Sequence, residues 1–177
     1  MVTTTQTPPP SKVSSPEQKF LTDLGRLYDA KCCFVEASQQ VQQQISNQQL
    51  KSAIQMDIGN NNHQIQNLEQ IFQTLGQQPQ RIKCESAAAL VSEGQKMVQE
   101  VGDNPMLRDA TIAVGQAAVK NAESSNYIAM ITAAGQKGQK EIVALLQQNL
   151  LQNQQAIPSF GLCHLELMKQ MASQSSK

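Results

Sequence analysis

Apolar side chains recur at spacings of three and four residues along most of this chain, and this periodicity limits the possible folds more than any other feature. One such series runs from Phe20 through Leu24 and Leu27, and another begins at Leu50. This spacing places the apolar side chains on one face of an α-helix. No stretch alternates apolar and polar residues as a half-buried strand would. The sequence therefore predicts an all-α fold.

Capping and breaking residues divide the pattern into separate helices. Ser15-Pro16 and Asn104-Pro105 are typical helix starts, whereas Gly76 is a typical helix end. Pro158 is expected to end or kink the last long helix. The expected helices are 16–45, 47–75, a shorter 84–101, 105–135, 139–156 and a short C-terminal one at 162–171. This order predicts a ferritin-like antiparallel four-helix bundle with a short connecting helix and a C-terminal helical tail.

The two ends of the chain differ in composition from the helical region. Residues 1–14 are rich in Thr and include Pro8, Pro9 and Pro10, so we expect a disordered arm. Residues 15–172 are expected to form the bundle as one domain. Residues 173–177 are expected to be a disordered tail.

Charge and hydropathy exclude several classes of partner. Lys plus Arg number 14 and Asp plus Glu number 14, so no net positive field is available to attract nucleic acid. No apolar run approaches the ~20 residues that a membrane-spanning helix needs. The first residues lack the basic start and apolar segment of a secretory signal, so a cytoplasmic location with reduced cysteines is expected.

Polar residues interrupt the apolar series near the middle of each long helix. They are Lys31, Asp57, Asn61, Asn121, Asn149 and Gln152. One interpretation is a shared buried layer, since the metal and cofactor sites of helix bundles occupy this mid-core position. The other interpretation is that the helical register drifts and these residues lie at a hydrated rim. The sequence alone leaves both open.

Four short motifs resemble the bacterial ferritin-like family of the YciE/YciF type. They are Leu27-Tyr28-Asp29-Ala30, Leu68-Glu69-Gln70-Ile71-Phe72 with Leu75-Gly76, Lys83-Cys84-Glu85 and Arg108-Asp109-Ala110, and the resemblance covers about 17–156. It implies a ferritin-like bundle, a homodimer, an association with bacterial stress responses and, in some members, two metal ions between the helices.

The same resemblance shows departures at the positions that it implies for metal ligands. Lys31 stands where such proteins carry Glu, and Asp57 and Asn60 stand where they tend to carry His and Glu. Lys120-Asn121 replaces a Glu-His pair, and Gln152-Asn153 replaces an acidic pair. The nearby acidic residue of the family is retained in this chain as Glu123. An amide is a poor sole ligand for iron or manganese, and an ammonium opposes a dication, so neither a metal nor another cofactor is expected.

The predicted site is therefore a vestigial polar layer without catalytic residues. Its members are Lys31, Asp57, Asn60, Asn61, Asn121, Glu123 and Gln152. We expect Lys31 to replace the metal charge by bonding to Asp57 or Glu123, with amides filling the remaining positions.

Three functions remain open on the sequence alone. The first is a non-catalytic, stress-associated bundle protein that acts through dimerisation or partner binding. The second is an iron- or manganese-binding oxidase or storage protein with an altered carboxylate site, using Asp57 and Glu123 with Glu36 or Glu85. The third is a small-ligand module whose cavity is lined by the polar layer and by methionines, including Met56 and Met130.

Overall fold

The computed structural model describes residues 6–10 and 12–175. Five helices account for most of them, and the predicted all-α class is confirmed. Among the described residues, none of these helices is both long and apolar enough to span a bilayer. The elements are β1 (Gln6–Thr7), α1 (Pro16–Gln42), α2 (Gln48–Thr74), β2 (Arg81–Ile82), α3 (Glu85–Glu100), α4 (Pro105–Gln136) and α5 (Lys140–Ser175).

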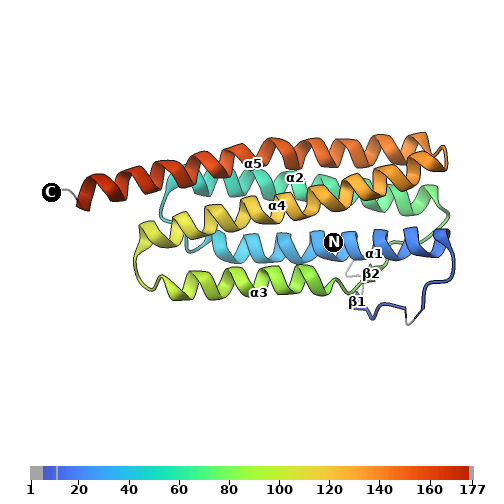
Figure 1. Ribbon diagram of the computed structural model, residues 1–177, viewed down its shortest axis with the longest axis horizontal. Coiled ribbons are helices and arrows are strands. Elements are labelled where there is room, and N and C mark those ends of the chain that lie inside the picture. The colour runs from blue at the N-terminus through green and yellow to red at the C-terminus, as the bar shows by residue number, and fades with distance from the viewer. Residues whose placement is uncertain (1–5, 11, 176–177) are drawn as a thin grey trace.

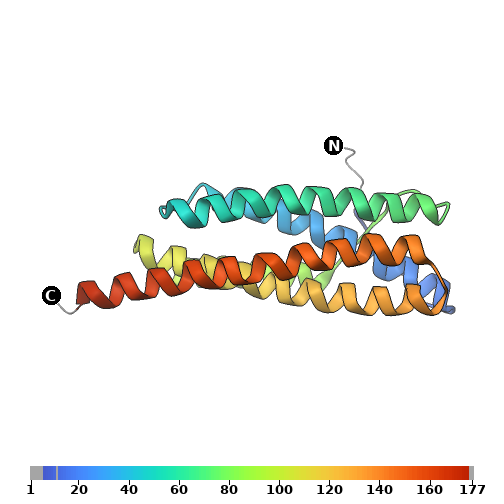
Figure 2. The ribbon, with the colours of Figure 1, turned by 90° about the horizontal axis from the view of Figure 1, so that it is seen from above.

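The four long helices form two antiparallel hairpins that pack together along their length. Contacts join α1 to α2 and α4 to α5. Figure 1 shows these helices from the side, and Figure 2 shows α2 in a layer above α4 and α5. The second and fourth helices run in the same direction, so the chain must cross the length of the bundle between them. The third helix makes this crossing and packs on α1 and α4. The predicted four-helix bundle with a connecting helix is confirmed.

Side chains cap the starts of three helices, and two of these caps, Ser15 and Asn104, are predicted from the sequence. The hydroxyl of Ser15 accepts a hydrogen bond from the backbone N–H of Gln18 at 3.1 Å, and the Asn47 side chain accepts from Leu50 at 2.9 Å. Asn104 accepts from two N–H groups of the first turn of α4. These bonds satisfy donors that a helix start leaves without intrahelical partners.

The interior consists of three apolar clusters. The two larger ones lie toward opposite ends of the bundle, and a smaller one joins α1 to α3 through Phe34 and Ala87. The first of the larger clusters includes Leu24, Tyr127 and Leu146, and the second includes Ile54 and Phe160. Buried polar side chains from all four long helices lie between the two larger clusters in the sequence of each helix. The mid-core layer is therefore buried, and the interpretation as a hydrated rim is wrong for most of its members.

The fifth helix differs from the prediction at Pro158. The helix continues through this proline without a break and reaches Ser175. Phe160, Cys163 and Leu167 beyond the proline are all buried, and their packing offsets the backbone hydrogen bond that a proline cannot donate. The separate C-terminal helix is thus an extension of α5, and 173–175 are helical. The end of the expected tail, 176–177, lies outside the described residues.

A short pair of strands is the second difference from the prediction. Gln6 pairs with Arg81 and Thr7 with Ile82 in parallel register, so this part of the 1–14 arm has a defined position. The cause is a buried acid on α1: both oxygens of Asp29 accept from the Gln6 amide, at 3.0 and 2.9 Å, and one accepts from Arg81 Nε at 2.9 Å. Residues 1–5 and 11 lie outside the described residues.

Candidate functional site

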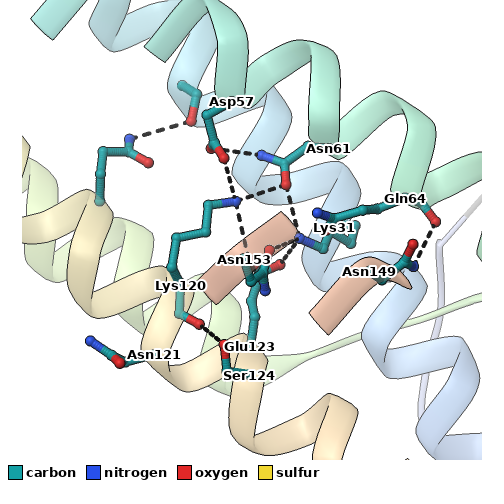
Figure 3. Close-up of polar contacts among 12 residues, drawn as sticks. Lys31, Asp57, Asn61, Gln64, Lys120, Asn121, Glu123, Ser124, Asn149 and Asn153 are labelled. Atoms are coloured by element: carbon teal, nitrogen blue, oxygen red, sulfur yellow. Dashed lines mark hydrogen bonds and ion pairs between the residues drawn. The ribbon is translucent and has the colours of Figure 1, made fainter. Parts of the chain in front are cut away.

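An ionic cluster occupies the middle of the bundle, and each of the four long helices contributes to it. Figure 3 shows its side chains pointing toward one another. Its members are Lys31 from α1, Asp57 and Asn61 from α2, Lys120 and Glu123 from α4, and Asn153 from α5. Both lysines are fully buried at 0% exposure, and Glu123 is 1% exposed.

Helical spacing explains why these residues meet. Lys31 lies four residues after Leu27 and three before Phe34, both of which are buried. Asp57 and Asn61 are four residues apart, and Lys120 and Glu123 are three apart, so each pair shares one helix face. The cluster thus occupies the middle of helix faces that point into the bundle and are apolar elsewhere.

The Lys31 ammonium has three partners, one for each of its protons. Its Nζ lies 2.6 Å from Oε1 of Glu123 in an ion pair. It donates to Oδ1 of Asn61 at 2.8 Å and to Oδ1 of Asn153 at 3.4 Å. It also lies 5.6 Å from the centre of the Tyr127 ring, within the range of a cation–π contact.

The Lys120 ammonium is surrounded in the same way. Its Nζ lies 2.9 Å from Oδ1 of Asp57 and 3.4 Å from Oε2 of Glu123. It also donates to Oδ1 of Asn61 at 2.8 Å. Because an ammonium has three donors and no acceptor, both lysines are saturated by these contacts.

Asn61 connects the two halves of the cluster. Its Oδ1 accepts from both lysines, while its Nδ2 donates to Oδ2 of Asp57 at 2.9 Å. A shared acceptor keeps the two ammonium nitrogens no farther apart than twice the 2.8 Å length of each bond. Two positive charges are thus held close together in a protein interior, and two carboxylates balance them.

The pKa values in the cluster follow the competition between burial and ion pairing. Burial lowers the pKa of Lys31 to about 8, although the pairing with Glu123 acts against this effect. Burial also acts to lower the pKa of Lys120, but its ion pairs with Glu123 and Asp57 outweigh burial and raise it. Burial acts to raise the pKa of Glu123, yet the two lysines lower it. All three groups are therefore charged at pH 7.

A second set of buried polar side chains, all uncharged, lies next to the ionic cluster. Asn149 Nδ2 donates to the backbone carbonyl of Gln64 at 3.2 Å, and to the hydroxyl of Tyr127 at 3.3 Å. Asn67 Nδ2 donates to Oδ1 of Asn149 at 2.7 Å. Burial raises the pKa of Tyr127 well above its ordinary value, so this phenol stays neutral.

The structure brings together four of the seven predicted site residues and separates the other three. Lys31, Asp57, Asn61 and Glu123 are in contact. Asn60 and Gln152 are half-buried outside the cluster, and Gln152 lies 3.4 Å from Nδ1 of His63 instead. Asn121 is exposed and donates to the carbonyl of Ala117, and Figure 3 shows its side chain pointing away from the cluster.

The predicted layer omits Lys120 and Asn153, each of which is adjacent in sequence to a predicted member. On α4, the apolar residues Leu107, Val114 and Ile128 are at least 38% exposed, so they do not mark the buried face. The correct signal was the series Lys120, Glu123 or Ser124, Tyr127, Met130 and Ala134, which shares one face at spacings of three and four. Lys is almost never fully buried unless it is paired, so residue type alone does not mark Lys120 as a core position.

Carboxylates elsewhere do not join the cluster. Glu36 is exposed and binds Arg81, and Glu85 is exposed and pairs with Lys83. The expected methionine-lined cavity at the layer is absent from the described residues, because Met56 is 70% exposed whereas Met130 is buried in the apolar core.

The residues of the cluster do not fit a di-iron or di-manganese centre. Each oxygen of Glu123 already faces an ammonium, and Asp57 binds Lys120 and Asn61. A dication placed here would meet two positive charges and weakly donating amides. Within residues 6–10 and 12–175, no group of three or more His, Cys, Asp or Glu is arranged to hold a metal ion.

The motifs that carried the family resemblance have structural roles outside this cluster. Asp29 binds the two strands and also accepts from the backbone N–H of Cys84 at 2.9 Å. Asp109 accepts from the backbone N–H groups of Ser46 and Asn47, the latter at 2.6 Å, at the turn between α1 and α2. These carboxylates hold loops to helices. The two motifs therefore stabilise the fold and do not depend on which residues occupy the ionic cluster.

Comparisons with known proteins agree with this architecture. YcfI of Rhodopseudomonas palustris, suggested to be a structural protein, matches with a TM-score of 0.82 and 25% identity over 85% of this chain and 96% of its own. The Escherichia coli stress protein YciF matches with a TM-score of 0.82 and 21% identity, over 89% and 99% of the two chains. No curated protein sequence matches. The family model described as a domain of unknown function (DUF892) matches residues 15–172, and this chain therefore belongs to that family.

Proposed function

We propose that this protein is a non-catalytic, stress-associated helical bundle in which two lysines replace a di-metal centre. One observation carries the proposal: both buried ammoniums have three partners each at the place where a bundle would hold metal ions. Two lysines and two carboxylates give the cluster a net charge of zero. The stress association rests on the family resemblance and on the fold shared with the stress protein YciF.

The saturated contacts also argue against chemistry at this site. A general acid or base must reach a proton on its substrate. Asp57 and Glu123 are 4% and 1% exposed, and neither lines either of the two main cavities of the described chain. The cluster is therefore suited to holding four helices together, and the protein's activity is expected to lie in what its surface binds.

The direct test is metal content by mass spectrometry after expression with added iron or manganese. Wild-type protein is expected to hold far less than one ion per chain. The double variant Lys31→Glu/Lys120→Glu replaces both ammoniums with carboxylates and is expected to gain bound metal. Lys51→Glu/Lys140→Glu makes the same charge change at exposed positions and is expected to gain none.

The alternative function makes the opposite prediction for the wild type. An iron- or manganese-binding oxidase or storage protein would hold about one or two ions per chain, as two-metal bundle sites do. Those ions would be lost in Asp57→Ala and in Glu123→Ala. That result would refute the proposal, and oxidase assays would follow.

A further inference from the structure

A cavity of about 420 Å³ lies between α3 and the face formed by α1 and α4. Its volume is within the range of small-molecule sites in proteins. Its apolar walls include Phe34 and Val41 from α1, Leu90 and Val98 from α3, and Ile112 from α4. It is separate from the ionic cluster, none of whose charged residues lines it.

The chemistry of the lining limits what the cavity can bind. None of the lining residues is Asp, Glu, Lys, Arg or His, and the polar groups are amides and hydroxyls. A charged molecule would lose hydration there without meeting an opposite charge, which is strongly unfavourable. The lining therefore favours an uncharged, mainly apolar ligand.

A buried polar pair supplies one anchor point. Ser38 is buried, and its hydroxyl accepts from the Gln116 amide at 3.3 Å. Both residues line the cavity. Together they present a hydroxyl and an amide, which can bind one hydroxyl, carbonyl or amine group of a ligand.

Two helix-interior glycines leave space free at opposite walls. Gly94 on α3 and Gly115 on α4 line the cavity, and a Cβ atom added at either would have no neighbour within 4 Å. A glycine inside a helix destabilises that helix relative to alanine. The open space at both positions makes the cavity roomy enough for a ligand.

The helix that covers the cavity is loosely held. Ala87 is the one fully buried residue of α3. Its N-cap, Cys84, makes no side-chain capping bond. Few buried contacts allow a segment to move at low cost in free energy, and outward movement of α3 would widen the opening of the cavity to solvent.

We propose that this cavity binds an uncharged, mainly apolar small molecule carrying one hydroxyl, carbonyl or amine group, with α3 as its movable cover. The ligand would place its apolar body between the three helices and its polar group at Ser38 and Gln116. The proposal does not depend on the ionic cluster or on its metal content.

Two dyes with the same aromatic skeleton test the requirement for an uncharged ligand. N-phenyl-1-naphthylamine is neutral, whereas 1-anilinonaphthalene-8-sulfonate carries a sulfonate. Fluorescence titration of the full chain is expected to give a Kd on the order of 10 μM for the neutral dye. The sulfonated dye is expected to bind at least about tenfold more weakly. No saturable binding of the neutral dye, or equal binding of both, would overturn the proposal.

A matched pair of variants locates the site. Gly115→Leu fills the cavity and is expected to weaken binding of the neutral dye at least about tenfold, because the side chain takes space that the ligand needs. Gly135→Leu is the same change on the same helix, outside the cavity, and is expected to leave the affinity unchanged. Circular dichroism checks folding, and Gly94→Leu fills the opposite wall if Gly115→Leu does not fold. Equal effects of cavity and control variants would show that the dye binds elsewhere.

Discussion

Removing one charge from the ionic cluster should destabilise the protein strongly, and removing its partner as well should restore part of the loss. Lys31 and Glu123 lie 2.6 Å apart with exposures of 0% and 1%. At an effective dielectric constant of about 20, the attraction of this pair is about 6 kcal/mol before desolvation is subtracted. Glu123→Gln leaves two buried ammoniums with one carboxylate, and such a loss typically costs about 3–5 kcal/mol.

The double variant Lys31→Met/Glu123→Gln leaves Lys120 with Asp57 and so keeps the cluster neutral. We expect the free energies of unfolding, from urea titrations at pH 7, to show a coupling of about 2–3 kcal/mol between the two changes. The exposed pair of Lys137 and Glu17 is the control, and its cycle should show almost no coupling. Additive costs for Lys31→Met and Glu123→Gln would refute the reasoning, because they would mean that the charges do not depend on each other.

Three further predictions concern pH, the strand pair and a close contact. Burial lowers the pKa of Lys31 to about 8, so between pH 8 and the ordinary value of 10.5 the unfolded chain binds more protons than the folded protein. The free energy of unfolding, relative to that of Lys31→Met, should therefore rise with pH across that window. Chemical denaturation at several pH values measures this, and a flat or falling difference would contradict it. Asp29→Asn should lower the free energy of unfolding by about 3–5 kcal/mol, because it leaves Arg81 without its buried carboxylate partner. Hydrogen exchange should also show weaker protection of the amides of Thr7 and Ile82. Unchanged protection would contradict this role of Asp29. Gly25→Ala should cost about 1–3 kcal/mol in thermal unfolding, since the added Cβ would lie 2.7 Å from the Ile82 side chain; a neutral effect would mean that Ile82 moves aside freely.

The helices and their order could be predicted from the sequence because each depends on local signals. Caps such as Ser15 and Asn104 act within one turn of the chain, and the apolar spacing acts over a few turns. Pro158 shows the limit of such signals. A proline predicts a helix end by itself, but the burial of Phe160 and Leu167 beyond it outweighs that local preference.

The site was harder to predict than the fold because it depends on the rotation of each helix about its axis. An error of one residue turns a helix by about 100°, and this error exchanged Lys120 for Asn121 and Asn153 for Gln152. The β1–β2 pair was also missed, since two-residue strands carry no alternation and depend on Asp29, which is distant in sequence.

The position of the ionic cluster between two apolar clusters has a consequence for how the helices find their alignment. Leu and Ile on neighbouring helices can slide by one turn, about 5.4 Å, and still bury similar apolar area. The same slide would carry Lys31 or Lys120 away from its carboxylate and leave a buried charge unpaired. Misaligned packings of the four helices are thereby disfavoured. The cluster therefore fixes the axial register of the helices, which apolar packing alone would leave ambiguous.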